Sequence, residues 1–420
     1  MTMTIRAALF ALAFACAVDP GGGDGLDASV GAGEPELGAL AADAASLAES
    51  AIPSWRFPVP VWPPAIAEEG RVDDLVRVGD TIFIGGNFTR VADHAGHTAA
   101  RTYLAAMDAR TGALRGFAPV LDGRVYALAA SPDGATLFAG GTFTHVNGAS
   151  RRRLVAFDVA TGQVSSALGD LALNGVVRAV ASNGSELFVG GAFTTAGGAN
   201  RARLAKLVRG SGGAFALAAW SPAASGGDVR DIVLDAAGNR ALVAGWFTAI
   251  GGQSAQKHLA AIDQDSGAIR PWSSHPGSPI LDIALDGGSL YAAMAGPGGT
   301  ALAYRLSDGG QRWYYKTDGN CQAVAVFAGH PIFGMHGDFV APVKNAPMSE
   351  FGDSERISRK KIFMLSADGD LMSWNPNLSS SDGPLGIWAL RASGGFLYAG
   401  GDFTRVHGVD QERFAIFESM

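Results

Sequence analysis

The stretch Gly140-Gly141-Thr142-Phe143-Thr144 decides the fold of this chain, because close variants of the same five residues return along most of its length. An apolar pair stands just before each copy and also survives where the glycines are lost. The pairs are Ile82-Phe83, Leu137-Phe138, Leu187-Phe188, Leu242-Val243, Leu290-Tyr291, Ile332-Phe333 and Leu397-Tyr398. Recurrence at a spacing of about fifty residues indicates a repeat architecture. The sequence therefore predicts seven units.

One unit is best followed after residue 124. The segments 125–129, 137–141 and 154–158 are short, apolar and separated by turn residues, and a weaker fourth segment follows them. Ser131-Pro132-Asp133-Gly134 places proline and glycine where a tight turn needs them. Four short strands in about fifty residues is the size of a propeller blade. We predict an all-β, seven-bladed β-propeller of four-stranded blades.

The two ends of the chain predict how this ring closes. The last unit stops after its third apolar segment, 413–417, and lacks a fourth. The N-terminal stretch 54–58 has the tryptophan-proline character of fourth segments such as 219–222 and 373–376. We expect the N-terminal strand to complete the last blade, which removes an exposed sheet edge.

The recurring residues suggest structural roles. A glycine pair lets the second strand approach its neighbour closely, and the following phenylalanine is expected to fill the space between blades. Arginines recur before the third strand, as Arg151, Arg153, Arg201, Arg203 and Arg413. We expect these arginines to pair with carboxylates or turn carbonyls. The alternative is a ring of arginines for an anionic ligand.

The pattern Leu-Phe-x-Gly-Gly-x-Phe-Thr-x-Val-x-Gly, then Arg-x-x-Leu, then Asp-x-x-Thr-Gly resembles the delta-60 repeat, a β-propeller repeat of secreted bacterial proteins. The resemblance covers about residues 66 to 420 and is strongest in units one to four and seven. Unit five departs from it, since Ala295-Gly296-Pro297 replaces the signature. The resemblance implies a propeller placed outside the cytoplasm, and it implies no catalytic residue.

The first residues predict export. Residues 1–17 carry Arg6 followed by an apolar run and a small-x-small cleavage pattern, as a secretory signal does. Cys16 resembles the lipid-modified cysteine of bacterial lipoproteins, and the alternatives are plain secretion and an incidental cysteine. Residues 18–53 are rich in Gly, Ala, Asp and Glu, which predicts a flexible tether. Residues 54–420 are assigned to the propeller.

Composition excludes some functions. The net charge of −7 gives no electrostatic reason to bind nucleic acid or an anionic membrane. We therefore expect no nucleic-acid partner, and membrane contact only through a lipid anchor. His94 and His97 lack a third ligand at a suitable spacing, so no metal site is expected, and no cofactor motif is present. Cys321 is predicted to be a buried small apolar group. We expect a monomer.

Two units carry longer loops between their second and third strands. Counting from the signature phenylalanine to the residue that opens the third strand gives 11 in most units, 16 in unit one and 23 in unit six. Loops on a rigid scaffold commonly carry function. The candidate binding residues there are His94, His97, Lys344, Phe351, Arg356 and Arg359. The alternative is a tolerated surface insertion.

The openings of the first strands are expected to line the channel mouth on that same face. The residues are Asp73, Asp74, Tyr126, Arg178, Arg230, Asp231, Asp282, Gln322 and Trp388. Such a mixed ring suits a small polar ligand, and a solvated funnel is the alternative.

Taken together, these patterns predict a non-catalytic binding or scaffolding propeller of the bacterial cell envelope. It would be secreted or an outer-membrane lipoprotein, and its partner would be an envelope protein or glycan. One alternative is a hydrolase or lyase that acts on polysaccharide with carboxylates among Asp73, Asp74, Asp231 and Asp282. Another is a purely structural surface protein.

Overall fold

The computed structural model describes residues 59–61, 70–93, 97–379 and 386–418, all within the compact unit Arg56–Met420. Within these residues the chain forms β-strands and two short 3-10 turns, η1 (Ser254–Gln256) and η2 (Met348–Glu350). The all-β prediction is confirmed for this part of the chain. The expected signal peptide, Cys16, the expected tether and His94 lie outside the described residues.

Strands that follow one another in the chain pair antiparallel and form small sheets. One of these sheets also contains a strand from the N-terminal end of the described chain. Some sheets have three strands: β2 (Val72–Val78), β3 (Thr81–Gly86) and β6 (Leu104–Asp108); β7 (Val125–Ala130), β8 (Thr136–Gly141) and β11 (Leu154–Asp158); β28 (Cys321–Phe327), β29 (His330–Met335) and β32 (Ile362–Met364).

Other sheets have four strands: β12 (Val177–Ser182), β13 (Glu186–Gly191), β16 (Leu204–Arg209) and β17 (Phe215–Leu217); β19 (Val229–Asp235), β20 (Arg240–Gly245), β22 (Leu259–Asp263) and β23 (Ile269–Arg270); β24 (Ile280–Asp286), β25 (Ser289–Met294), β26 (Thr300–Arg305) and β27 (Gln311–Lys316); β33 (Ile387–Ser393), β34 (Phe396–Gly401), β37 (Phe414–Glu418) and β1 (Val59–Val61). We name each sheet by its first strand, the last being the β33 sheet.

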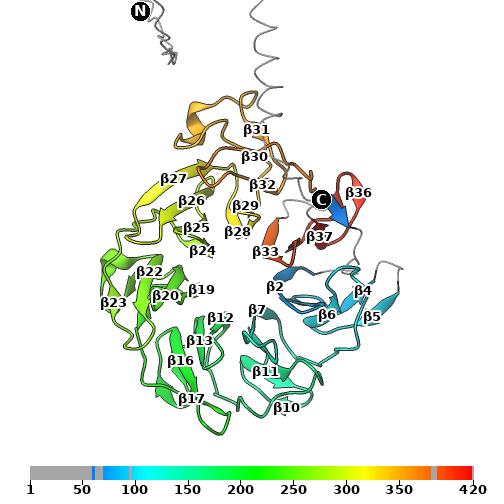
Figure 1. Cartoon of the computed structure of the whole chain (residues 1–420), viewed down its shortest axis with the longest axis vertical. Helices are drawn as coiled ribbons and strands as arrows, with labels where there is room; N and C mark the ends of the chain where they lie inside the picture. The colour runs from blue at the N-terminus through cyan, green and yellow to red at the C-terminus, as the bar shows by residue number, and fades with distance from the viewer. Residues whose placement is uncertain (1–58, 62–69, 94–96, 380–385, 419–420) are drawn as a thin grey trace, which may run out of the picture. The chain divides into compact units, whose positions relative to one another are not determined.

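The sheets radiate from a common centre, which their first strands surround (Figure 1). Each first strand contacts the first strand of the next sheet, and β33 contacts β2, in the order β2, β7, β12, β19, β24, β28, β33. Radial sheets around a central channel are the arrangement of a β-propeller. The sheets are therefore its blades.

The N-terminal strand joins the last blade. β1 pairs antiparallel with β37, with Val59 opposite Glu418 and Val61 opposite Ile416. The sequence placed this strand at residues 54–58, which lie outside the described residues, and the described part of the pairing strand is Val59–Val61. The join between the last and first blades is also packed tightly, since a Cβ added to Gly400 would meet Val72 Cγ1 at 2.5 Å.

The fourth strand is weak in some blades. In the β2, β7 and β28 sheets the fourth segment makes only one isolated bridge, at Met107–Leu114, Phe157–Val164 and Leu365–Leu371 respectively. The fourth segment is the outermost of the blade, where water can satisfy the backbone groups that the sheet leaves unpaired. A single bridge therefore holds this segment beside the third strand. The prediction of four full strands in every blade is therefore wrong for these three sheets as the structure describes them.

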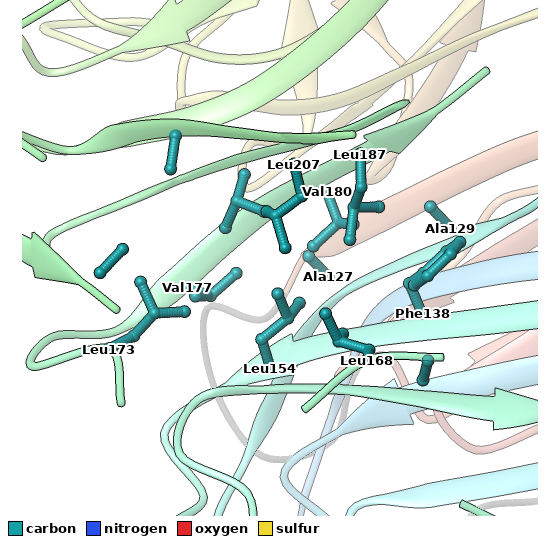
Figure 2. Close-up of a cluster of buried hydrophobic side chains, with 14 of the residues drawn as sticks. Ala127, Ala129, Phe138, Leu154, Leu168, Leu173, Val177, Val180, Leu187 and Leu207 are labelled. Atoms are coloured by element: carbon teal, nitrogen blue, oxygen red, sulfur yellow. The ribbon is translucent and has the colours of Figure 1, made fainter. Parts of the chain in front are cut away.

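The glycine pair has two distinct steric functions. A Cβ on the first glycine, Gly140, would lie 2.3 Å from Val177 Cγ1 in the next blade, and one on Gly141 would lie 2.0 Å from Arg124 O in its own blade. The signature phenylalanine Phe143 is fully buried, as is Phe193. Figure 2 shows one inter-blade cluster, in which Phe138 packs with apolar side chains from the β7 and β12 blades. Both sequence expectations are confirmed.

The residue before the third strand holds a left-handed turn in most blades. Its φ angle is 73° at Arg153, 68° at Arg203 and 65° at Arg413. The backbone N–H of Arg153 donates to Phe143 O, and its carbonyl accepts from Gly141 N. Arg201, two residues before Arg203, donates to the carbonyls of Asn200 and Ala218. The recurring arginines thus bind main-chain carbonyls, which is the structural role expected for them.

A short hairpin follows the second strand in most blades. The hairpins are β4 (Arg90–Ala92) with β5 (Thr98–Ala100), β9 (His145–Val146) with β10 (Ala149–Ser150), β14 (Thr195–Ala196) with β15 (Ala199–Asn200), β30 (Phe339–Val340) with β31 (Ile357–Ser358), and β35 (Arg405–Val406) with β36 (Val409–Asp410). In the β19 blade, β21 (Ala249–Ile250) pairs instead with β18 (Ala224–Ser225). Because first and second strands are antiparallel, these hairpins and the openings of the first strands lie on one face.

Candidate functional site

The first strands surround a cavity of about 540 Å³ at the centre of the propeller. The predicted mouth residues all line it: Asp73, Asp74, Tyr126, Arg178, Arg230, Asp231, Asp282, Gln322 and Trp388. A shallower hollow of about 90 Å³ at the mouth is lined by Arg71, Asp73, Tyr126, Arg178, Arg230, Leu281, Gln322 and Trp388. The structure therefore brings together residues that are more than 300 positions apart in the sequence.

A repeated backbone irregularity sets these side chains in place. Each first strand opens with a buried residue, such as Val72, Val229 or Ile280, and its register against the second strand then shifts. The shift is a β-bulge, which turns successive side chains toward the channel. As a result, the residue after the buried one lies at the mouth and the next one lies deeper.

One side of the mouth is built from two arginines that share one carboxylate. Arg71 Nε lies 2.8 Å from Asp73 Oδ1, and Arg124 donates to both oxygens of Asp73. Arg71 also lies over the Trp388 ring, 3.7 Å from its centroid. Arg124 lies 4.6 Å from the centroid of Tyr126. Asp73 is nearly buried and is paired with both arginines.

A second pair of arginines shares Asp228. Arg178 Nε and Arg230 Nε lie 2.8 and 3.0 Å from the same oxygen, Asp228 Oδ2. Arg178 also lies over the Tyr126 ring, 4.5 Å from the centroid. Burial and the neighbouring Arg178 charge lower the pKa of Arg230. The two guanidiniums therefore repel each other across a single negative charge.

The opposite side of the mouth has no charged side chain at this strand position, and the charges near it are Arg71 over the Trp388 ring and one acid behind that ring. Leu281, Gln322 and Trp388 hold the same strand position as Arg178 and Arg230. The Trp388 indole donates to Asp402 Oδ2 at 3.2 Å. Gln322 is 4% exposed, and among the described residues its Oε1 has no hydrogen-bond partner. The mouth thus has a basic half and a neutral half.

Three acids lie below the mouth, at Asp74, Asp231 and Asp282. Each accepts a backbone N–H from the first strand of another blade: Asp74 from Leu128 at 2.7 Å, Asp231 from Ile283 at 3.0 Å, and Asp282 from Val324 at 2.8 Å. The four remaining blades have alanine at this position, namely Ala127, Ala179, Ala323 and Ala389. The acids therefore tie neighbouring blades together.

Arg391 partly neutralises this acidic layer, and sequence reasoning missed it. Its Nη2 donates to Asp74 Oδ1 at 2.8 Å, and its Nη1 lies 3.8 Å from Asp282 Oδ2. Burial lowers the pKa of Arg391, but the carboxylates outweigh burial and raise it. The sequence did contain a signal, because the strand position of Arg391 is apolar in every other blade. The residues there are Val76, Ala129, Ala181, Val233, Ala284 and Ala325.

Burial raises the pKa of two of these acids despite Arg391. It raises the pKa of Asp74 above its usual range, and it raises that of Asp282 further. The Asp231 carboxylate adds to the effect at Asp282, through repulsion and through a hydrogen bond between the two side chains. A neighbouring carboxylate disfavours the charged form of a buried acid in this way.

The loop candidates do not join the mouth site. Lys344 pairs with Asp370 at 2.7 Å, and Arg356 pairs with Asp353 at 2.8 Å. Phe351 is half-buried against the apolar core beneath the loop. Arg359 donates to Ser358 O and Met372 O, as Arg201 does with its own carbonyls, so its contacts belong to the blade framework. The loop residues therefore pair and pack within the loop and its own blade.

In the other long loop, His97 is exposed and its Nδ1 lies 3.0 Å from Asp93 Oδ2. No group of acids, histidines and cysteines within the described residues could hold a metal ion. Cys321 is fully buried, and burial raises the pKa of its thiol to about 12, as expected for an inert apolar group. No helix in the described part of the chain is long and apolar enough to cross a membrane.

Comparisons with known proteins agree on the fold. No family model and no curated protein sequence matches the chain. Solved structures do match, among them the WD40 repeats of RRP9 at 12% identity, covering 87% of this chain and 100% of that one, with a TM-score of 0.55. The structure of U3-55K matches at 13% identity, 84% and 97% coverage and a TM-score of 0.53.

The WD40 β-propeller domain of Doa1 matches at 12% identity, covering 86% of this chain and 97% of that one, with a TM-score of 0.52. At such low identity the likeness concerns the fold alone. Together with the radial sheets described above, it shows that this chain is a β-propeller.

Proposed function

We propose that this chain is a non-catalytic binding propeller that works outside the cytoplasm and holds an envelope protein or glycan on the face of the channel mouth. The observation that carries the proposal is the mouth itself. It combines an arginine-rich half, two aromatic rings and an unpartnered amide above a cavity of about 540 Å³. Ligand sites are typically cavities of roughly this size with a few convergent polar groups.

The propeller is proposed to have seven blades in a closed ring. The cyclic contacts of the first strands and the pairing of β1 with β37 support closure. The delta-60 repeat is proposed as the family, on the strength of the recurring signature and of the steric need for its glycines. Membership would place the protein in the envelope, either secreted or anchored through a lipid on Cys16. We propose that it acts as a monomer.

Catalysis is the second candidate, and the raised pKa of Asp282 beside Asp231 favours it. Neighbouring carboxyls can act as acid and base on a polysaccharide. However, Asp74, Asp231 and Asp282 all accept backbone N–H groups from another blade, and Asp73 is held by two arginines. These contacts favour an architectural function for the acids, and hence binding over catalysis.

A steric block at the mouth tests the binding proposal. Leu281 lines the mouth hollow on its neutral side, so Leu281→Trp would fill that hollow without changing any charge. We expect the full chain to bind envelope proteins or cell-surface glycans saturably and to leave the glycans uncleaved. The L281W variant should lose this binding, whereas a chain lacking residues 344–356 should retain it.

Each other result has a distinct meaning. Equal binding by the wild type and L281W would show that the mouth is not the binding site. Loss of binding only in the loop deletion would move the site to the long loop. Cleavage of a glycan that Asp282→Asn abolishes would establish the catalytic alternative. An absence of all saturable binding would favour a purely structural surface protein.

A further inference from the structure

The charge balance of the mouth leaves positive charge unmatched. Four arginines, Arg71, Arg124, Arg178 and Arg230, face only Asp73 and Asp228 between them, and Asp402 lies behind the Trp388 ring. The deeper layer holds three acids, Asp74, Asp231 and Asp282, against Arg391, so by count it is net negative and does not add to the positive charge above it. The surplus charge is therefore at the entrance, where an incoming molecule would meet it first.

The surplus is concentrated at Arg178 and Arg230. Their recorded ion pairs both end on one oxygen, Asp228 Oδ2, so a single carboxylate serves two guanidiniums. Arg178 is also held by the Tyr126 ring, 4.5 Å away, and Arg124 lies 4.6 Å from the centroid of the same ring. A planar guanidinium held in this way is preorganised for bidentate contact with a carboxylate.

The neutral half of the mouth supplies a different kind of contact. Gln322 is 4% exposed and lines both the mouth hollow and the cavity, and its Oε1 is buried without a partner among the described residues. An unpartnered buried acceptor costs free energy that a donor on a ligand would recover. Gln322 Oε1 lies against Gly386, and once the amide turns toward the cavity a hydroxyl group is the neutral donor that fits this acceptor.

A ligand that satisfies both halves must carry a carboxylate and hydroxyls a short distance apart. We propose that the mouth binds an acidic sugar, with Arg178 and Arg230 holding its carboxylate and Gln322 accepting a hydrogen bond from one of its hydroxyls. The inference rests on the proposed binding function and names its ligand class. An acidic peptide would satisfy the arginines, but its side-chain carboxylate brings no hydroxyl to Gln322.

Calorimetric titration of the full chain tests this inference. The probe is trigalacturonic acid, and its fully methyl-esterified form is the matched neutral control. We expect the acid to bind at least about tenfold more tightly than the ester, with the difference shrinking as salt rises. Arg178→Gln with Arg230→Gln should lower the affinity for the acid by about tenfold or more. Arg305→Gln, at an exposed ion pair with Asp308, should leave it unchanged.

A gain of affinity guards against variants that simply fold poorly. Asp228→Asn removes the carboxylate that competes with the ligand, so it should raise the affinity for trigalacturonic acid by about threefold or more. A variant that only damages the fold cannot give this result. Gln322→Leu should weaken the binding of both the acid and its ester, because the hydroxyl contact is common to both.

The outcomes separate the failure of this inference from that of the proposed function. Equal binding of acid and ester, or binding unaffected by the double arginine variant, would overturn the inference while leaving a sugar-binding propeller. Binding of triglutamate but not of trigalacturonate would overturn the choice of a sugar and leave a protein-binding mouth. No binding of any of these probes, together with no saturable envelope binding, would overturn both.

Discussion

Arg391 and Asp74 lie 317 residues apart in the sequence, yet Arg391 Nη2 donates a hydrogen bond to Asp74 Oδ1 at 2.8 Å. The contact joins the last blade to the first. Two further hydrogen bonds cross the same join, from Arg77 to Ser393 O at 2.9 Å and from the Tyr398 hydroxyl to Ala109 O at 3.0 Å. The ends of the repeat array are thus held together at the channel as well as by the pairing of β1 with β37.

Removal of Arg391 should weaken this join. Arg391→Met keeps much of the side-chain volume but leaves Asp74 and Asp282 buried without their counter-charge. We expect the free energy of unfolding to fall by about 3 kcal/mol at neutral pH. Urea denaturation measures the change. Arg405→Met, at an exposed ion pair with Asp410, is the control and should change stability little. An unchanged midpoint for R391M would contradict the importance of the join.

The pH dependence of stability should carry the signature of Asp282. Burial raises its pKa in the folded state, so the folded chain binds more protons than the unfolded chain above about pH 4. Its contribution is therefore present at acidic pH and is lost as pH rises toward the raised pKa. Asp282→Asn stays neutral at every pH. We expect the stability of D282N relative to the wild type to increase from pH 4.5 to 7.5.

Asp308 provides a control of opposite sign. A hydrogen bond from the Gly310 backbone and contacts with Arg305 lower its pKa, so its contribution is present above the unfolded pKa and is lost on acidification. The deficit of Asp308→Asn should therefore shrink as pH falls below about 4. If D282N and D308N showed the same trend with pH, the assignment of a raised pKa to Asp282 would be wrong.

The glycine pair predicts a specific rescue. Gly140→Ala would place a methyl group 2.3 Å from Val177 Cγ1 and should lower the free energy of unfolding by about 2 kcal/mol. Adding Val177→Ala removes that atom. The double variant should therefore lose less free energy of unfolding than the sum of the losses in the two single variants. Gly116→Ala, with no atom within 4 Å of the new methyl, should be nearly neutral. Strictly additive effects would show that the two positions do not contact.

Truncation tests the closing strand. A chain starting at residue 54 retains β1, whereas a chain starting at residue 62 lacks it and leaves β37 as an unpaired edge. We expect the longer chain to unfold in one cooperative transition. The shorter chain should melt at a lower temperature or over a broader range. Calorimetry of both chains measures this, and identical transitions would show that β1 contributes nothing to closure.

The sequence was sufficient for the fold because its signals repeat. Gly140 or Phe143 alone would predict little, but their recurrence shows that each unit solves the same packing problem. The mouth residues Asp73, Arg178 and Trp388 could be predicted for a similar reason, since each follows the first buried residue of a repeat. A position known in one blade predicts the same position in all of them.

What could not be predicted depends on contacts between blades. Arg391 is a single charge within an apolar strand, and its partner Asp74 is near only once the ring has closed. Asp228 is close in sequence to Arg230, but its pairing with Arg178 crosses between blades. The framework role of Arg359 was also missed, because the inserted residues before it obscured its match to Arg201. Pairings of this kind follow from the arrangement of repeats in space.

The most direct test of the account is a crystal structure of the full chain grown with trigalacturonic acid. The account predicts that a carboxylate of the sugar lies within hydrogen-bonding distance of both Arg178 and Arg230, with a hydroxyl group on Gln322 Oε1. Sugar density elsewhere on the molecule, over a mouth that holds only water, would contradict it.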